Sequence, residues 1–111
     1  MPKRAFVTGA TGFTGGHLTR KLIRDGWEVT ALVRENSKYE ALKQLGCRLV
    51  FGDITDKNSF SSSLKDIDVV FHIAAFYRDE GKDAVFRKVN IEGTHNLLEA
   101  SIENKAGKFI H

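Results

Sequence analysis

Short apolar runs and longer amphipathic stretches alternate along the whole chain. The runs are rich in β-branched side chains, such as Val29, Thr30 and Val33, which are typical of strands. The run after Asp68 is almost continuously apolar and suits a strand that is covered on both faces. The pattern therefore predicts strands at residues 4–8, 28–33, 48–51, 67–73 and 108–110.

Helical spacing of apolar residues fills the gaps between the predicted strands. It predicts helices at residues 14–25, from 40 through 45, at 57–64 and at 83–104, with Gly26 and Gly46 as C-terminal caps of the first two. Ser37 and Glu40 have the spacing of a capping box at the start of the second helix. Gly93 lies within the longest helix, where it costs about 1 kcal/mol relative to alanine, so we expect a close packing contact there.

Alternating strands and helices require parallel strand pairing with right-handed crossover connections. The expected fold is α/β, a doubly wound parallel sheet of the Rossmann type with five strands in the order 3-2-1-4-5 and helices on both faces. We expect residues 1–111 to form one domain. In such folds the ligand binds at the carboxyl ends of the first and fourth strands.

A glycine-rich segment, residues 8–15, joins the first predicted strand to the first predicted helix. Gly9 permits a tight turn, Gly12 lets the backbone approach a phosphate, and Gly15 lets helix and strand pack closely. The N–H groups and the dipole of a helix start favour an anion such as a pyrophosphate. The spacing is G-x-x-G-x-x-G, and a flexible turn is the alternative interpretation, but the strand before it and the helix after it favour dinucleotide binding.

Three further residues suggest contacts with the adenosine end of a dinucleotide. Arg34 directly follows the second predicted strand, where a carboxylate would bind the 2′-hydroxyl of NAD and an arginine suits the 2′-phosphate of NADP. Arg34 therefore predicts NADP rather than NAD as the cofactor, although a solvated arginine is the alternative. Asp53 and Ile54 follow the third strand, where Asp53 can accept a bond from the adenine amino group and Ile54 can cover the ring. A simple turn aspartate explains Asp53 equally well.

Composition and charge narrow the classes of partner. The net charge is +3 without a basic block, so we expect no nucleic-acid partner. No apolar stretch approaches about 18 residues and no signal peptide is evident, so we expect no membrane segment. Cys47 is the lone cysteine, which fits a reducing cytoplasm. The four histidines show no ligand spacing with Cys47, so we expect no metal site.

Four segments occur in an order that resembles the amino-terminal half of the extended short-chain dehydrogenase/reductase family: residues 8–15, 52–54, 71–75 and 90–98. That family includes NAD(P)-dependent sugar epimerases and dehydratases, and residues 72–78 are most similar to its dihydroflavonol-reductase-like branch. The resemblance implies that the backbone of Thr11, Gly12, Phe13 and Thr14 holds the pyrophosphate. It places Ala74 and Ala75 under the cofactor, and it implies that Asn90 supports the proton relay or the geometry of the active-site helix.

Some roles stay open under this resemblance. For Asn90, a hydrogen bond within its own helix is the alternative to a role in the site. His72 matches a strand residue of the family, and we expect it to be structural rather than catalytic.

The catalytic residues of this family are a serine after the fifth strand and a tyrosine followed four residues later by a lysine. They lie beyond residue 111, so we expect the chain to be truncated before them and to hold no catalytic residue. Tyr39 and Lys43 have the same spacing, but they lie on the second helix at the adenosine end and are not expected to be catalytic.

Two functions follow from the resemblance. The chain is the cofactor-binding part of an oxidoreductase, epimerase or dehydratase, or it is a module that senses NADP(H) without turnover; a purely structural role is a weaker third. Because the family packs further elements on the last helix and strand, we expect an open sheet edge and an uncovered stripe at Phe86, Val89 and Leu97. Both features favour either self-association into a homo-oligomer or low stability.

Overall fold

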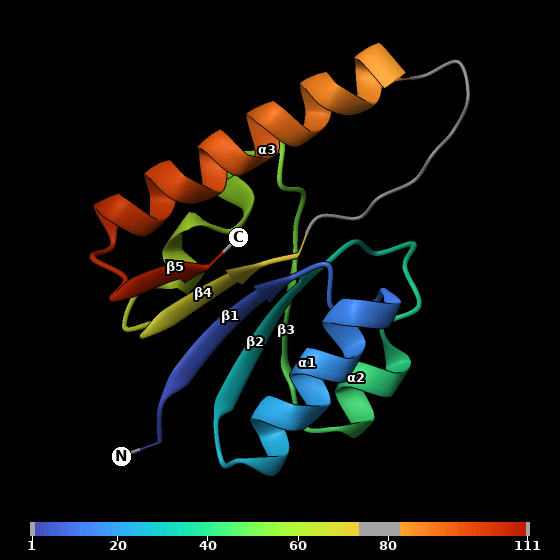
Figure 1. Ribbon diagram of the computed structural model, residues 1–111, viewed down its shortest axis with the longest axis vertical. Coiled ribbons are helices and arrows are strands. Elements are labelled where there is room, and N and C mark those ends of the chain that lie inside the picture. Colours follow the sequence, from blue (N-terminus) through green and yellow to red (C-terminus); the bar gives the residue numbers. More distant parts are fainter. Residues whose placement is uncertain (1, 74–82, 111) are drawn as a thin grey trace.

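The chain folds around a five-stranded parallel sheet with the strand order β3-β2-β1-β4-β5 (Figure 1). The computed structural model describes residues 2–73 and 83–110, and for 83–90 the backbone alone. The strands are β1 (Arg4–Thr8), β2 (Glu28–Val33), β3 (Arg48–Phe51), β4 (Val69–His72) and β5 (Lys108–Ile110). The predicted strand order is confirmed, and only the fourth strand is shorter than expected.

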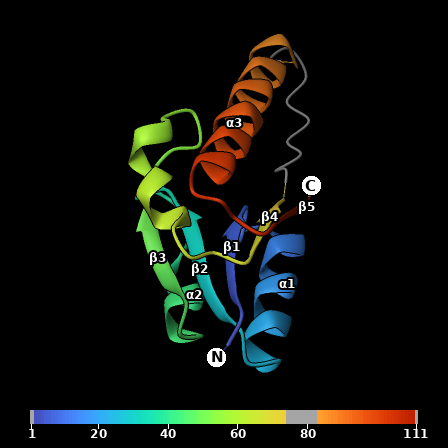
Figure 2. The ribbon, with the colours of Figure 1, turned by 90° about the vertical axis from the view of Figure 1, so that its left-hand side faces the viewer.

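Helices cover both faces of this sheet, as Figures 1 and 2 show. Helices α1 (Phe13–Arg24) and α2 (Glu40–Gln44) lie on one face, and α3 (Asp83–Glu103) lies on the other with two short 3₁₀ turns. These turns are η1 (Lys57–Ser59) and η2 (Ser61–Leu64). The doubly wound arrangement is therefore confirmed.

The alternation of side chains along the central strand produces two separate cores. Ala5 and Val7 of β1 face α1 and α2, whereas Phe6 between them faces α3 and η2. All three side chains are fully buried, because a central strand of a doubly wound sheet is covered on both faces. The first core includes Leu22 and Leu42, and the second is built around Phe60, Leu64, Val70, Leu97 and Ala100.

The helix expected at residues 57–64 is wrong, because two 3₁₀ turns broken at Phe60 replace it. Phe60 has φ −134°, which no α-helix accommodates. The reason is local competition for backbone groups, since the Ser59 hydroxyl donates to the carbonyl of Asp56 at 2.6 Å. Phe60 and Leu64 are nevertheless buried on one side, as their spacing indicated.

The expected capping box is also wrong. The Ser37 hydroxyl donates to the carbonyl oxygen of Arg34 at 2.6 Å, and Tyr39, which makes no side-chain cap, precedes α2. Ser37 instead closes the turn after β2, because its backbone N–H donates to the same carbonyl at 3.0 Å. The positive φ angles of Gly26 and Gly46 fit their predicted roles at the ends of the first two helices.

The outward face of α3 differs from the expected one. Leu97 is fully buried against η2 and Phe6, so its assignment to an uncovered stripe is wrong, and the side chains of Phe86 and Val89 lie outside the described residues. The exposed apolar side chains of the described part of α3 are Ile91, Leu98 and Ile102. Gly93 makes the close contact predicted for it, since an added Cβ would lie 2.7 Å from Ile54 Cγ2. Within the described chain, no helix combines the length and apolar character needed to cross a membrane.

Candidate functional site

The glycine-rich turn lies where β1 and β4 end, and backbone packs against backbone there. Gly9 has φ +69°, and a Cβ on it would overlap the carbonyl oxygen of Ile73 directly after β4. A Cβ on Gly15 would lie 2.7 Å from the carbonyl carbon of Gly9 and 2.9 Å from Ala10 Cα. Only glycine fits either position, so the first turn of α1 is held close against the end of β1.

The amino terminus of α1 has local features that favour an anion. Gly12 precedes the helix, it provides no side-chain cap, and the first turn carries no acidic side chain. The first N–H groups of a helix have no partner within the helix, and the helix dipole favours negative charge beside them. Thr11, Phe13 and Thr14 are exposed around this end. The residues predicted to hold a pyrophosphate are thus brought together at one accessible helix terminus.

A buried histidine ties this turn to the opposite face of the sheet. His72 Nδ1 lies 2.7 Å from the hydroxyl of Thr8, the residue before Gly9, and His72 Nε2 lies 2.9 Å from the hydroxyl of Thr94 on α3. His72 is 7% exposed, so these contacts are shielded from water. The arrangement fits the structural role that we expected for this residue.

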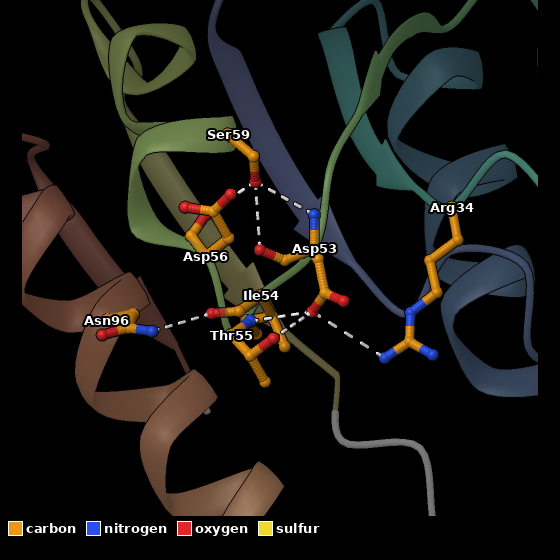
Figure 3. A network of polar contacts seen from close by, with 7 residues as sticks. All are labelled: Arg34, Asp53, Ile54, Thr55, Asp56, Ser59 and Asn96. Carbon is orange, nitrogen blue, oxygen red and sulfur yellow. Dashed lines mark hydrogen bonds and ion pairs between the residues drawn. The ribbon is translucent and has the colours of Figure 1, made fainter.

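A second group of predicted residues gathers where β2 and β3 end (Figure 3). Arg34 Nη2 lies 4.0 Å from Asp53 Oδ1, and the two side chains are 60% and 48% exposed. The two strands pair in parallel, with Val33 opposite Phe51, so their next residues emerge at the same edge. The structure therefore brings together two of the three residues predicted for the adenosine end.

The Asp53 carboxylate is held in place by the residue two positions later. Asp53 Oδ1 accepts hydrogen bonds from the Thr55 hydroxyl at 2.7 Å and from the Thr55 backbone N–H at 2.9 Å. The Thr55 hydroxyl lowers the pKa of the Asp53 carboxyl most, followed by the Thr55 N–H and more weakly by the Arg34 charge, while partial burial opposes them. Asp53 is therefore a turn aspartate. Its contact with adenine stays a prediction.

Ser59 and Asn96 also fix this loop, although neither is among the residues that the sequence indicated. The Ser59 hydroxyl oxygen accepts from the backbone N–H of Asp53 at 3.0 Å, and Asn96 Nδ2 donates to the carbonyl of Ile54 at 3.1 Å (Figure 3). The Ile54 side chain packs against Gly93 of α3. An aspartate two positions before a threonine is a signal for the turn that the sequence contains, whereas the Asn96 contact spans 42 positions and leaves no local signal.

A cavity of about 270 Å³ opens between α1 and α2 beside the glycine-rich turn. Thr11, Gly12 and Phe13 line one side of it, and the basic side chains of Arg20 and Lys38 line the rest with apolar residues of α2. Arg34 and Asp53 are not part of its wall. The predicted pyrophosphate and adenosine residues therefore share an edge of the sheet without sharing this cavity.

Three predicted residues cannot be placed. Ala74 and Ala75 lie outside the described residues, and of Asn90 only the helical backbone is described. Tyr39 packs edge-on against Phe51 with ring centroids 5.0 Å apart, which explains it as a packing residue rather than half of a catalytic pair with Lys43. Among the described residues, no three histidine, cysteine or acidic side chains are grouped to hold a metal ion.

Comparison with known proteins agrees with this fold. A putative dihydroflavonol 4-reductase of Synechocystis sp. is 38% identical over 104 residues, which is 92% of this chain and 29% of that protein. The crystal structure of a dTDP-glucose 4,6-dehydratase from Streptomyces venezuelae with NAD bound has a TM-score of 0.82 at 28% identity, covering 97% of this chain and 38% of that one. A UDP-glucose 4-epimerase from Bifidobacterium longum shares the fold with a TM-score of 0.84 at 23% identity, over 96% of this chain and 36% of that one.

The chain spans about a third of the length of these relatives. Its strand order is that of a dinucleotide-binding sheet, and its glycine-rich turn lies at the carboxyl end of β1. The model of one family matches residues 5–111, which is nearly the whole chain. The chain belongs to the NAD-dependent epimerase/dehydratase family.

Proposed function

We propose that this chain is the cofactor-binding part of a reductase, epimerase or dehydratase and that it prefers NADP(H) to NAD(H). The observation that carries the proposal is the uncapped amino terminus of α1, packed against the end of β1 by Gly9 and Gly15. Gly12 has no side chain and the first turn of α1 carries no acidic residue, so a pyrophosphate can approach the N–H groups of this terminus. The bound NAD of the related dTDP-glucose 4,6-dehydratase supports the same cofactor class.

The residues of the chain bind and orient the dinucleotide, and the cofactor, when bound, supplies hydride chemistry. Backbone N–H groups near Phe13 and Thr14 hold the pyrophosphate, and Arg34 takes the 2′-phosphate at the end of β2. Asp53 and Ile54 form the adenine end, and the family resemblance assigns Ala74 and Ala75 to positions under the cofactor and Asn90 to a supporting role in the active-site helix. The turnover step belongs to catalytic residues of a longer protein in this proposal.

The alternative of a module that senses NADP(H) without turnover shares every one of these contacts. The gene sequence after codon 111 distinguishes the two: a serine and a Tyr-x-x-x-Lys segment in frame would indicate an enzyme, and a stop codon would favour the sensor. A cytoplasmic location and self-association through the exposed edges β3 and β5 or through α3 also remain predictions.

The test of the cofactor preference is a fluorescence titration with NADPH and NADH. A charge-assisted bond to phosphate is worth about 1.5–3 kcal/mol, so Arg34→Ala should reduce the ratio of NADPH to NADH affinity about tenfold or more. Arg24→Ala is the matched control, because it removes one exposed positive charge from the opposite end of α1. An unchanged ratio in Arg34→Ala would overturn the preference, and no binding of either coenzyme to the folded chain would overturn the dinucleotide site.

A further inference from the structure

The carboxylate of Asp53 faces the same guanidinium group that we assign to the 2′-phosphate. The distance from Arg34 Nη2 to Asp53 Oδ1 is 4.0 Å, and Figure 3 shows the two side chains pointing toward each other from adjacent strand ends. A charge-assisted hydrogen bond would be about 2.7–2.9 Å long. Arg34 is therefore attracted by Asp53 without being hydrogen-bonded to it, and it stays available to a second anion.

Asp53 is the fixed partner of this pair. Its Oδ1 accepts two hydrogen bonds from Thr55, at 2.7 and 2.9 Å, and its backbone N–H donates to Ser59 at 3.0 Å. The loop that carries it is attached to α3 through Asn96, which donates to the carbonyl of Ile54. The negative charge thus occupies a defined position, while Arg34 is the long side chain that can turn away from it.

This fixed charge acts against any phosphate that reaches Arg34. An anion in contact with the guanidinium lies only several ångströms from the Asp53 carboxylate, so the two negative groups repel each other and compete for one cation. A ribose with a free 2′-hydroxyl carries no charge to repel. The pair therefore has opposite effects on the two coenzymes, with Arg34 favouring NADP and Asp53 opposing it.

We infer that Asp53 is a specificity-determining residue that counteracts Arg34 and leaves the site able to take both NADP(H) and NAD(H). This inference rests on the proposed function, since it needs a dinucleotide at this edge of the sheet. Both side chains are about half exposed, so water weakens the effect. Coulomb's law at a water-like dielectric constant gives a change of roughly three- to tenfold in relative affinity.

The experiment is a titration of the wild-type chain and Asp53→Asn with NADPH and NADH at low ionic strength. Asparagine keeps a carbonyl oxygen for the Thr55 bonds and removes the charge. We expect the ratio of NADPH to NADH affinity to rise three- to tenfold, mainly through tighter NADPH binding, and the difference to shrink in added salt. Asp56→Asn is the matched control, since it removes an acid from the same exposed loop and should leave the ratio unchanged.

The outcomes separate the role of Asp53 in coenzyme specificity from the dinucleotide site itself. Binding of both coenzymes with an unchanged or lower ratio in Asp53→Asn overturns the inference and leaves the dinucleotide site intact. Failure of the folded wild-type chain to bind either coenzyme overturns the site as well. If Asp53→Asn does not fold by circular dichroism, Asp53→Ser removes the same charge with a smaller polar side chain, and the same rise in the ratio is expected.

Discussion

Adding one methyl group at Gly15 should separate α1 from the turn that it packs against. The new Cβ would lie 2.7 Å from the carbonyl carbon of Gly9, 2.9 Å from Ala10 Cα and closer still to the Gly9 carbonyl oxygen. Ordinary contacts begin near 3.4 Å, so backbone atoms have to move by about 1 Å. None of the three atoms belongs to a flexible side chain, so the overlap cannot be relieved by a rotamer change.

Gly16 is the neighbouring residue in the same helix and supplies the control. A Cβ there would meet its nearest atom, the carbonyl oxygen of Ala10, at 3.5 Å, which is an ordinary contact. Gly16→Ala should therefore stabilise the fold by about 0.5–1 kcal/mol through helix propensity alone. Gly15→Ala gains at most as much but costs about 1–3 kcal/mol or more through overpacking, so the two variants should differ by about 2 kcal/mol.

Urea unfolding followed by circular dichroism measures this difference, and a thermal melt should place Gly15→Ala about 10 °C below Gly16→Ala. A titration with NADPH gives the second readout, because displacement of the first helical turn moves the N–H groups proposed to hold the pyrophosphate. Equal stability and equal NADPH affinity in the two variants would refute the account of why a glycine stands at position 15.

Two further predictions concern the loop after β3. Thr55→Val removes a hydrogen bond that lowers the pKa of Asp53, so the pKa should rise toward its ordinary value in a carboxyl NMR titration, and an unmoved midpoint would contradict the assignment. Because the pKa of Asp53 is lowered in the folded chain, the ionised carboxylate stabilises the fold at pH values above its unfolded-state pKa, near 4. This stabilisation is lost as the pH falls through the folded-state pKa. Gly93→Ala places a Cβ 2.7 Å from Ile54 Cγ2 and should destabilise the fold by about 1 kcal/mol. The double variant Gly93→Ala/Ile54→Ala removes that overlap, so its loss of stability should be smaller than the sum of the two single losses. Strictly additive losses in urea unfolding would count against the contact.

The strand order was predictable because alternating strands and helices require parallel pairing with right-handed crossovers, and burial of the central strands on both faces leaves continuous apolar runs in the sequence. In β1, for example, Phe6 stands between Ala5 and Val7, and each of the three finds a buried place. The 3₁₀ turns at Lys57–Leu64 were not predictable from apolar spacing, because the Ser59 hydroxyl competes for backbone groups that spacing ignores.

In the candidate site, the roles of the glycines could be predicted from the sequence spacing between strand and helix. The positions of the other side chains depend on tertiary contacts. The pairing of Arg34 with Asp53 follows from the strand order, once both are known to emerge from adjacent strands. The burial of Leu97 depends on η2, a segment more than thirty positions earlier in the chain, so helical spacing alone left its partner undefined.

The contacts of His72 with Thr8 and Thr94 have a consequence for the motions of the fold. A threonine hydroxyl both donates and accepts, so either neutral tautomer of the imidazole preserves the two contacts. The ring thus joins β1, β4 and α3 regardless of which nitrogen carries the proton. Amide protons of these three elements should therefore exchange with solvent deuterium as one cooperative unit.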